Sequence, residues 1–461
     1  MGRLHIASWL LASSLCVSAP AQEGDPTVPQ ETPDVRMPAG DAARGIPMPT
    51  GTFDQEVYRA RRQRVMEQLD GDVAVVFGAT SIGTHGAQDA DFYYLTGLAQ
   101  ETGAALVLAP SEPVHKEFLF LRGIDPEQNR WNGERAILGR GIELGTGFAR
   151  VYRMSRLGGV LALTGVHAEE FVFLGPIVGY DKPIPKALQV SKDASARLPG
   201  VSVRMDHRLL RRMRQLHDEA ELDLMGQAIA CTAAGLEAAM CNVRAGMSEF
   251  ELKQVIERGF RDAGSRRNAF DSIVASGPNG AVLHYPDDGR LMQAGELVLC
   301  DVGAEIEHYA SDVTRTFPVS GRFTPRQREV YEVVLRAQQA AIDATRAGVR
   351  LREDIHQAAR HVIEQAGFTD DFFHGTSHFV GLEVHDAGLA DEPLPAGTVI
   401  TIEPGIYLAD EALGIRIEDE VLITEDGCVV LTEAIPRSID AIERLMARCN
   451  SHVSAPTGVS P

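Results

Sequence analysis

The chain has 461 residues, of which 44% are hydrophobic and 23% are charged, and its formal net charge is −20. This length allows two or three domains with well-filled cores, and the composition is ordinary for a globular protein. The excess of acidic residues excludes broad binding to nucleic acid or to an anionic membrane, because such partners require clustered cations. The ligands left open are small molecules and neutral or cationic partners.

Residues 1–21 have the pattern of a secretory signal peptide. They carry one early cation, a short apolar centre and small residues at Ala19 and Ala21, which predicts cleavage after Ala21. The apolar centre is too short to cross a bilayer, and no later segment is expected to form a stable membrane span. Residues 22–50 hold six prolines among polar residues, which predicts a disordered tether. We therefore expect an exported protein, either periplasmic or secreted.

Removal of the signal leaves five cysteines, an odd number with no paired spacing: Cys231, Cys241, Cys300, Cys428 and Cys449. This pattern excludes a disulfide framework and a Cys-x-x-Cys metal site. One optional bridge could form in an oxidising compartment. Our expectation is nevertheless that these residues are buried thiols without a function.

Residues 51–210 are expected to form an α/β domain. A helix is predicted at 58–69, and apolar runs predict buried strands. These runs lie at residues 72–77, 104–108, 117–121, 160–163 and 171–174.

Helical periodicity begins after Asp218, which forms a capping-box pattern with Glu221. Ser248 and Glu251 repeat this pattern and open a second helix that ends at Gly264. Residues 211–448 are expected to form a second domain of mixed helices and strands, followed by a tail at 449–461.

Two acidic residues mark the centre of this second domain. An apolar run ends on Asp301, a turn follows, and a run rich in β-branched and aromatic residues begins at Asp312. This pattern predicts two adjacent strands that each present a carboxylate. Buried like charges must share a proton or hold a cation between them, so the pair indicates a metal site or an acid–base dyad.

The second domain contains an internal duplication. Arg244-Ala-Gly246 and Arg346-Ala-Gly348 each precede a predicted helix, and they lie 102 residues apart. Asp301 and Glu403 are separated by the same 102 residues, and Glu403 also closes an apolar strand. Glu418 follows Glu403 much as Asp312 follows Asp301. Each copy is therefore expected to supply two carboxylates.

The segment 414–424 is expected to be a single strand, in which Arg416 and Glu418 share one face by alternation. An ordinary solvent-exposed strand face would show the same pattern, but the duplication favours a functional site at Arg416 and Glu418. Three histidines lie between the copies, at His374, His378 and His385. Gly375 and Gly381 disfavour a helix there, and the His-Glu-x-x-His zinc pattern is absent.

Four carboxylates and one imidazole suit two divalent cations that share carboxylate ligands. Manganese fits this oxygen-rich set best, with zinc or cobalt as alternatives. Two such cations lower the pKa of a water molecule between them and polarise a carbonyl group, so amide hydrolysis is the expected chemistry. The other histidines and Arg416 would orient the substrate and stabilise the oxyanion.

These residues resemble the pita-bread metallopeptidases, and most closely the aminopeptidase P family. The resemblance covers about residues 53–448. It rests on Ile273-Val-Ala-Ser-Gly277, Leu283-His-Tyr285, the Asp301 and Asp312 pair, the block from His374 to His385, Thr401-Ile-Glu-Pro-Gly-Ile-Tyr407 and Arg416-Ile-Glu418. Asp91-Phe-Tyr-Tyr-Leu-Thr-Gly97 and Trp131-Asn-Gly133 are similar to the first domain of that family.

The resemblance implies a pita-bread (creatinase/aminopeptidase) fold with a pseudo-twofold duplication, and a role for each site residue. The implied metal ligands are Asp301, Asp312, His378, Glu403 and Glu418. His284, His385 and Arg416 would line the site, and Glu403 would also move a proton. His374 would be a supporting residue, and Tyr407 would form a wall of the pocket for the first side chain. The implied substrates are peptides with proline at the second position.

Three other functions are weighed against this one. Prolidase, a Xaa-Pro dipeptidase, shares all five ligands, but Ser377 and the segment 321–331 favour aminopeptidase P. Methionine aminopeptidase lacks such an N-terminal domain. A metal-free binding or scaffold protein of the same fold would be expected to lack ligands, whereas all five positions are filled here.

The resemblance also implies a homo-oligomer, a dimer or tetramer, in which Trp131 could narrow the site of a neighbouring copy.

Overall fold

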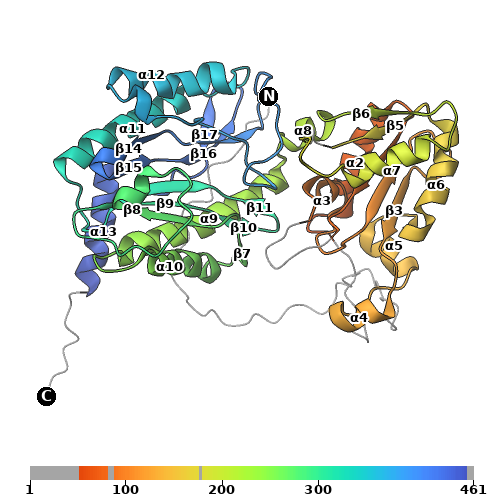
Figure 1. Cartoon of the computed structure of the whole chain (residues 1–461), viewed down its shortest axis with the longest axis horizontal. Helices are drawn as coiled ribbons and strands as arrows, with labels where there is room; N and C mark the ends of the chain where they lie inside the picture. Colours follow the sequence, from red (N-terminus) through yellow and green to blue (C-terminus); the bar gives the residue numbers. More distant parts are fainter. Residues whose placement is uncertain (1–50, 81–87, 176–178, 454–461) are drawn as a thin grey trace, which may run out of the picture. The chain divides into compact units, whose positions relative to one another are not determined.

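The computed structural model describes residues 51–80, 88–175 and 179–453 (Figure 1). The predicted signal peptide and tether lie outside these residues, so the structure does not test them. Sequence patterns predict individual helices and strands, whereas the structure shows how these elements are arranged.

The first part of the chain contains a six-stranded mixed sheet in the order β4-β3-β2-β1-β5-β6. Its strands are β1 Val73–Phe77, β2 Ala105–Leu108, β3 Glu117–Leu121, β4 Val151–Arg153, β5 Glu170–Phe173 and β6 Ser202–Met205. Its helices are α2 Gln55–Leu69, α3 Ala90–Thr96, α4 Pro126–Asn132, α5 Arg140–Thr146, α6 Leu157–Thr164, α7 Lys186–Ser195 and α8 Leu209–Arg214.

Side chains of β1 alternate between two cores, which explains why the strand is apolar throughout. Ala74 and Val76 pack with α2 and α3, whereas Val73 and Val75 pack with α6 and α7. Helices therefore cover both faces of the sheet, as an α/β domain requires.

One predicted strand is wrong. Residues 160–163 belong to helix α6, in which Leu157, Val160, Leu161 and Thr164 are buried. These positions have helical spacing, and Leu163 is 60% exposed. A short apolar run cannot be assigned to a strand or a helix by periodicity alone, and here the buried face follows the helical period.

The second part begins with two long helices and is built around small antiparallel sheets. The helices are α9 Glu219–Asn242, α10 Glu249–Asp262, α11 Pro325–Ala344, α12 Gln357–Gln365 and α13 Ile439–Val453. The strands are β7 Arg267–Asn268, β8 Ile273–Ser276, β9 Leu297–Val302, β10 Ala304–Ile306, β11 Tyr309–Ala310, β12 Val313–Pro318, β13 Val399–Ile402, β14 Gly405–Leu408, β15 Leu413–Arg416, β16 Asp419–Ile423 and β17 Cys428–Val430.

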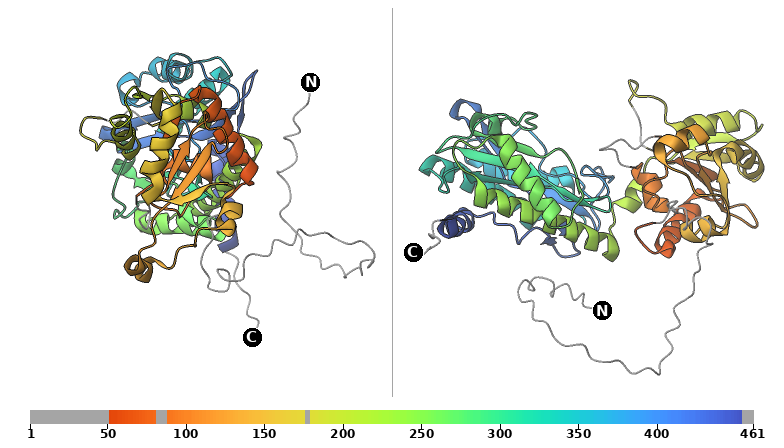
Figure 2. Two further views of the ribbon diagram at one scale, coloured as in Figure 1. Left: turned by 90° about the vertical axis from the view of Figure 1, so that its right-hand side faces the viewer. Right: turned by 90° about the horizontal axis from the view of Figure 1, so that it is seen from below.

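The duplication is visible in the order of these elements. Helices α9 and α10 precede the β12-β9-β8 sheet, and helices α11 and α12 precede the β13-β16-β17 sheet. Both predicted capping boxes are present, at the starts of α9 and α10. Figure 2 shows α9 and α10, coloured green, side by side, and their apolar faces share one core with both sets of strands.

Helix α9 is the one helix in the described ranges with the length and hydropathy needed to cross a membrane. This finding corrects the prediction that no segment after the signal is long enough to span a membrane. Its apolar residues Met225, Leu236 and Met240 are buried in the protein core. Helix α9 is therefore a helix of the protein core.

Two expectations for the second part are corrected. Residues 414–424 do not form one strand, because β15 pairs with β14 whereas β16 pairs with β13. The chain changes sheets at Ile417 and Glu418. The turn between Asp301 and Asp312 also contains a short hairpin, β10 and β11.

The expectation for the cysteines is wrong at two positions. Cys241, at the end of α9, and Cys449, in α13, form a disulfide across 208 residues of sequence. Cys231, Cys300 and Cys428 are free thiols. Sequence spacing could not reveal this bridge, because the two helices meet only in the folded chain.

Candidate metal centre

Strands β9 and β12 place the first pair of carboxylates together. The antiparallel register sets Asp301 opposite Thr314, and Asp312 lies two residues before Thr314. By alternation, these three side chains share one face. Gly303 allows the chain to close here, because a Cβ atom at that position would lie 1.8 Å from the backbone oxygen of Ser311.

Strands β13 and β16 place the second pair. Ile402 is opposite Asp419, so Glu403 and Glu418 occupy the next opposed positions beyond the ladder. The side chain of Glu418 is buried and that of Glu403 is 17% exposed. Each copy of the duplication therefore supplies two carboxylates from an antiparallel strand pair.

Thr314 joins the two copies, and sequence reasoning missed it. Its backbone oxygen accepts the N–H of Glu418 at 3.1 Å, and its hydroxyl donates to the Glu418 carboxylate at 2.7 Å. The same hydroxyl oxygen accepts from Nε of Arg416 at 3.0 Å. Its position two residues after Asp312, on the same face of a strand, was the available signal.

His378 lies at the junction of the two carboxylate pairs. Its Nε2 is 3.4 Å from an oxygen of Asp312 and 3.8 Å from an oxygen of Glu403. One ligand atom from each of Asp312, His378 and Glu418 lies within 4.8 Å of the others. This spacing is suited to a metal ion. Asp301 lies beside this group, and its carboxylate accepts a hydrogen bond from Nη2 of Arg416 at 2.6 Å.

The hydrogen bonds of His378 leave Nε2 available as a ligand atom. Its Nδ1 lies 3.0 Å from the backbone oxygen of Phe379, and a carbonyl oxygen only accepts. The proton is therefore on Nδ1, and Nε2 presents its lone pair to the carboxylates. Burial lowers the pKa of His378 to about 4, so the ring is neutral near pH 7.

Arg416, Tyr407 and His374 form a chain beside the carboxylates. Nη1 of Arg416 donates to the Tyr407 hydroxyl at 2.9 Å, and that hydroxyl is 2.9 Å from Nε2 of His374. Since Nδ1 of His374 faces the backbone oxygen of Gly375 at 2.7 Å, Nε2 is the acceptor for the hydroxyl proton. Burial and the charge of Arg416 lower the pKa of His374 to about 4.

The other two predicted histidines lie nearer the solvent. His385 is exposed, and its ring packs edge-on against His378 with centroids 4.3 Å apart. His284 is an exposed turn residue that is close enough to His374 to lower its pKa. The structure thus brings all ten predicted site residues into one neighbourhood, although it does not test their roles.

The centre contains more buried acids than cationic partners, and this favours their protonated forms when no cation is bound. Burial, reinforced by neighbouring carboxylates, raises the pKa of Asp312 and of Glu418 well above the usual range. Burial also raises the pKa of Glu403 and of Glu420 to about 8. Glu420, whose Oε1 accepts the N–H of Asp312 at 2.8 Å, was not anticipated, although it follows Glu418 by two residues.

These residues fit a bound cation. Within the described residues, Oδ1 of Asp301 and Oδ1 of Asp312 are buried and have no hydrogen-bond partner. Buried carboxylate oxygens normally have partners, so two such atoms facing one centre indicate missing positive charge. One guanidinium and two neutral imidazoles cannot balance five acidic side chains.

The comparisons with known proteins agree with this reading. Residues 223–425 match Metallopeptidase family M24, and residues 58–172 match the Aminopeptidase P, N-terminal domain. The "Xaa-Pro aminopeptidase" of Haemophilus influenzae is 34% identical over 435 residues, which cover 85% of this chain and 97% of that protein.

Structural similarity extends over both parts. The structure of a putative aminopeptidase P from Bacillus anthracis matches with a TM-score of 0.79 at 28% identity, covering 86% of this chain and 99% of that one. The "Xaa-Pro dipeptidase" of Pyrococcus furiosus is 37% identical, but over only 49% of this chain and 65% of that protein.

The fold and the site define a metallopeptidase of family M24 with a pita-bread catalytic domain. Within that family the chain belongs to the aminopeptidase P group, the Xaa-Pro aminopeptidases. The resemblance noted in the sequence is confirmed, as are the expected two-domain fold class and the hydrolase class.

Proposed function

We propose that this enzyme removes the first residue of peptides that carry proline at the second position, and that it does so with two divalent cations. Asp301, Asp312, His378, Glu403 and Glu418 would hold the cations. The observation that carries this proposal is the cluster of carboxylates around Nε2 of His378. Two oxygens of this cluster, Oδ1 of Asp301 and Oδ1 of Asp312, are buried and have no hydrogen-bond partner among the described residues. When bound, two such cations polarise the substrate carbonyl and make a water molecule more acidic.

Manganese is the proposed metal because the ligand set is rich in oxygen. Four carboxylates and one imidazole suit manganese better than a soft metal, which prefers thiolate ligands. Zinc and cobalt are the alternatives. The neutral state of His378 favours any of these cations over a proton at Nε2.

Glu403 is the proposed proton carrier. Its carboxylate is 3.8 Å from His378 and 3.8 Å from His374, and burial raises its pKa to about 8. That value belongs to the metal-free protein; with the cations bound, the ionised carboxylate can accept the proton of the attacking water at Oε and pass it to the proline nitrogen. That nitrogen must be protonated before it leaves as an amine.

Histidines at the mouth of the site are proposed to hold the substrate. His385 and His284 are exposed, so their ring N–H groups can donate to the carbonyl oxygen as it gains negative charge. The Tyr407 ring, held by Arg416 and His374, would form a wall for the first side chain. The Xaa-Pro bond has no N–H group, so recognition depends on the shape of such walls.

Aminopeptidase action is favoured over dipeptidase action by the extent of the match. The similarity to Xaa-Pro aminopeptidases includes the N-terminal domain, whereas the match to the dipeptidase covers about half of this chain. Both activities would use the same metal ligands. They differ in whether a peptide may continue beyond proline.

Export and oligomerisation are also proposed. The Cys241–Cys449 disulfide supports an oxidising compartment, periplasmic or extracellular, as the signal pattern suggests. The 82% exposure of Trp131 on α4 supports a contact with another copy in a dimer or tetramer.

The test compares substrates of graded length with purified enzyme before and after chelation. We expect cleavage of Ala-Pro-Ala and of longer Ala-Pro peptides, much slower cleavage of Ala-Pro, and none of Ala-Ala-Ala. Chelation should abolish activity, and manganese should restore it most fully. Metal analysis should find two ions per chain.

Preferential cleavage of Ala-Pro would instead assign a dipeptidase. Full activity of the chelated enzyme, confirmed to be free of metal, would refute the proposed centre. One ion per chain at full activity would refute the second cation.

A further inference from the structure

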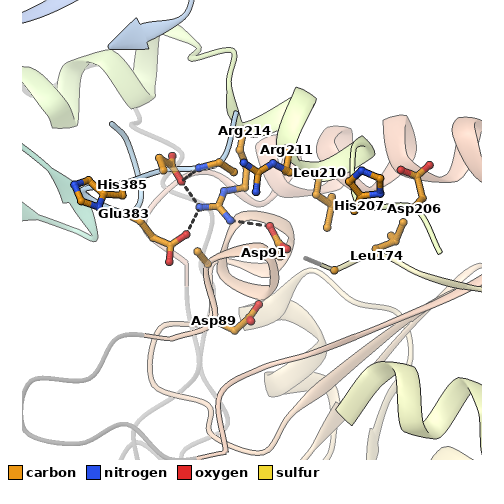
Figure 3. A pocket seen from close by; sticks show the side chains of 14 residues that line it. Asp89, Asp91, Leu174, Asp206, His207, Leu210, Arg211, Arg214, Glu383 and His385 are labelled. Atoms are coloured by element: carbon orange, nitrogen blue, oxygen red, sulfur yellow. Dashed lines mark hydrogen bonds and ion pairs between the residues drawn. The ribbon is translucent and has the colours of Figure 1, made fainter. Parts of the chain in front are cut away.

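A buried arginine outside the metal centre is joined to the segment that carries two of the site histidines. Arg214 is the last residue of α8, and its side chain is 5% exposed. Nη1 donates to Asp91 at 2.8 Å, and Nη2 donates to Glu383 at 2.7 Å and also to Asp386. Figure 3 shows this fork, with Asp91 on one side and Glu383 and His385 on the other.

Asp386 transmits this contact to the backbone around His385. Its two carboxylate oxygens accept the N–H groups of Ala387 at 2.7 Å and of Leu382 at 3.1 Å. Its own N–H donates to the backbone oxygen of Phe379 at 2.9 Å. The carboxylate thus closes a loop from 379 to 387, and a charged hydrogen bond from Arg214 fixes that carboxylate.

Close packing inside the loop requires this geometry. A Cβ atom at Gly381 would lie 2.3 Å from Oδ2 of Asp386 and 2.7 Å from the ring of His217. The loop backbone therefore wraps directly around the carboxylate that Arg214 holds. No other side chain could occupy the position of Gly381 without displacing that carboxylate.

The loop also lines a pocket. A cavity of about 240 Å³ is lined by Asp91, Arg214 and His385, among others. A side chain next to such a space can change rotamer unless polar contacts restrain it. The ion pairs of Arg214 supply that restraint.

We infer that Arg214 is a positioning residue for His385, which it holds against His378 through Asp386. The inference rests on the proposed role of His385 at the substrate carbonyl. The two imidazole rings are in edge-on contact, and His385 directly precedes the residue that Arg214 anchors. A displacement of about 1 Å at a reacting group can cost about 10²-fold in rate, so loss of this anchor should be measurable.

The test is a double-mutant cycle in the full-length, metal-loaded enzyme, assayed with Ala-Pro-Ala. Arg214→Lys keeps the charge but cannot bridge three carboxylates with a planar fork. We expect it to lower kcat about 10-fold, with KM changed by less than about twofold. Arg214→Met should lower kcat further, by about 10²-fold. In a His385→Ala background, Arg214→Lys should lower kcat less than about twofold, because the residue that it positions is already absent.

Arg208→Lys is the matched control. Arg208 flanks the same helix and pairs with Asp391 and Glu392 farther along the segment, at the protein surface. Its replacement should leave kcat unchanged. Metal content should also be unchanged in Arg214→Lys, because the inference concerns His385 and not the ligands.

Four outcomes would overturn the inference. These are a wild-type kcat for Arg214→Lys, an equal loss of kcat in the His385→Ala background, loss of metal from Arg214→Lys, and an equal effect of Arg208→Lys. Wild-type turnover by His385→Ala alone would remove the role on which the inference rests. A wild-type enzyme inactive on Ala-Pro-Ala would instead refute the proposed function.

Discussion

At the scale of single residues, the effect of Glu418 on activity and stability depends on whether a cation is bound beside it. Glu418 is fully enclosed, receives a hydrogen bond from Thr314 and lies near Asp312 and His378. Its burial beside other acids is unfavourable without a cation. The same carboxylate should therefore support activity with metal and weaken the fold without it.

We predict that Glu418→Gln abolishes most activity and stabilises the metal-free protein. The amide matches the shape of the carboxylate but lacks the charge that a cation requires, so kcat/KM should fall by more than about 10²-fold. In chelator, Glu418→Gln should raise Tm because the neutral amide removes the free-energy cost of burying an acid whose pKa is raised. Steady-state kinetics and thermal unfolding provide the two measurements.

Glu411→Gln is the control for that prediction. Glu411 is a surface residue paired with Arg326, so its replacement should change neither quantity appreciably. A Glu418→Gln enzyme that keeps wild-type turnover would show that this residue is not a ligand.

At the scale of elements, the Cys241–Cys449 disulfide links the end of α9 to the last helix, α13. Helix α13 packs into the main core through Ile442, Leu445 and Met446. A cross-link that closes a long loop reduces the freedom of the unfolded chain more than that of the folded one.

We predict that Cys449→Ser lowers the free energy of unfolding by about 2–4 kcal/mol. Urea unfolding of wild type and variant, each with and without reductant, measures this change. Reductant should destabilise the wild type and leave Cys449→Ser unaffected. Kinetics with Ala-Pro-Ala should be unchanged at 25 °C, because neither cysteine contacts the metal centre.

Cys428→Ser is the matched control, since Cys428 is a free thiol whose replacement leaves the bridge intact. Mass analysis after thiol labelling of the unfolded, non-reduced protein should find Cys231, Cys300 and Cys428 labelled and the other pair protected. Labelling of Cys241 in protein purified without reductant would contradict the disulfide.

The whole molecule depends on pH through its buried acids. In the metal-free form, burial raises the pKa of Glu403 and of Glu420 to about 8, above the unfolded value of about 4.5. Between those pKa values the folded state binds more protons than the unfolded state does. The stability of the metal-free enzyme is therefore highest at or below pH 4.5 as far as these two groups are concerned, and is lost as pH rises toward 8.

We predict that chelated enzyme loses stability from pH 5 to pH 8, by up to about 1.4 kcal/mol per pH unit for each such group. Metal-loaded enzyme should lose much less, because the cations replace the proton on Glu403 and their positive charge favours the ionised form of Glu420. Thermal unfolding across this range, with and without manganese, measures the difference. Glu420→Gln removes one titrating group and should reduce the slope of the chelated form, whereas parallel curves for the two forms would contradict the prediction.

Local chemistry in the sequence accounts for much of the fold. The capping boxes at Asp218 and Ser248 identify two helix starts because a side chain and a backbone N–H three residues away satisfy each other. The repeat spacing relates Asp301 to Glu403 because duplicated elements keep their order. The same local reasoning failed at α6, where an apolar run of four residues is compatible with a strand or a helix.

The sequence alone therefore determined which residue types this enzyme offers for catalysis and in which order, since helix caps, strand alternation and repeats are local properties. Only the tertiary structure decided which atoms meet. Thr314, Glu420 and Arg214 act across about 100 or more residues of chain, and the partners of a buried polar group depend on which distant strands and loops enclose it. The Cys241–Cys449 bridge has the same cause: contact between two helices is a property of the packed core, not of cysteine spacing.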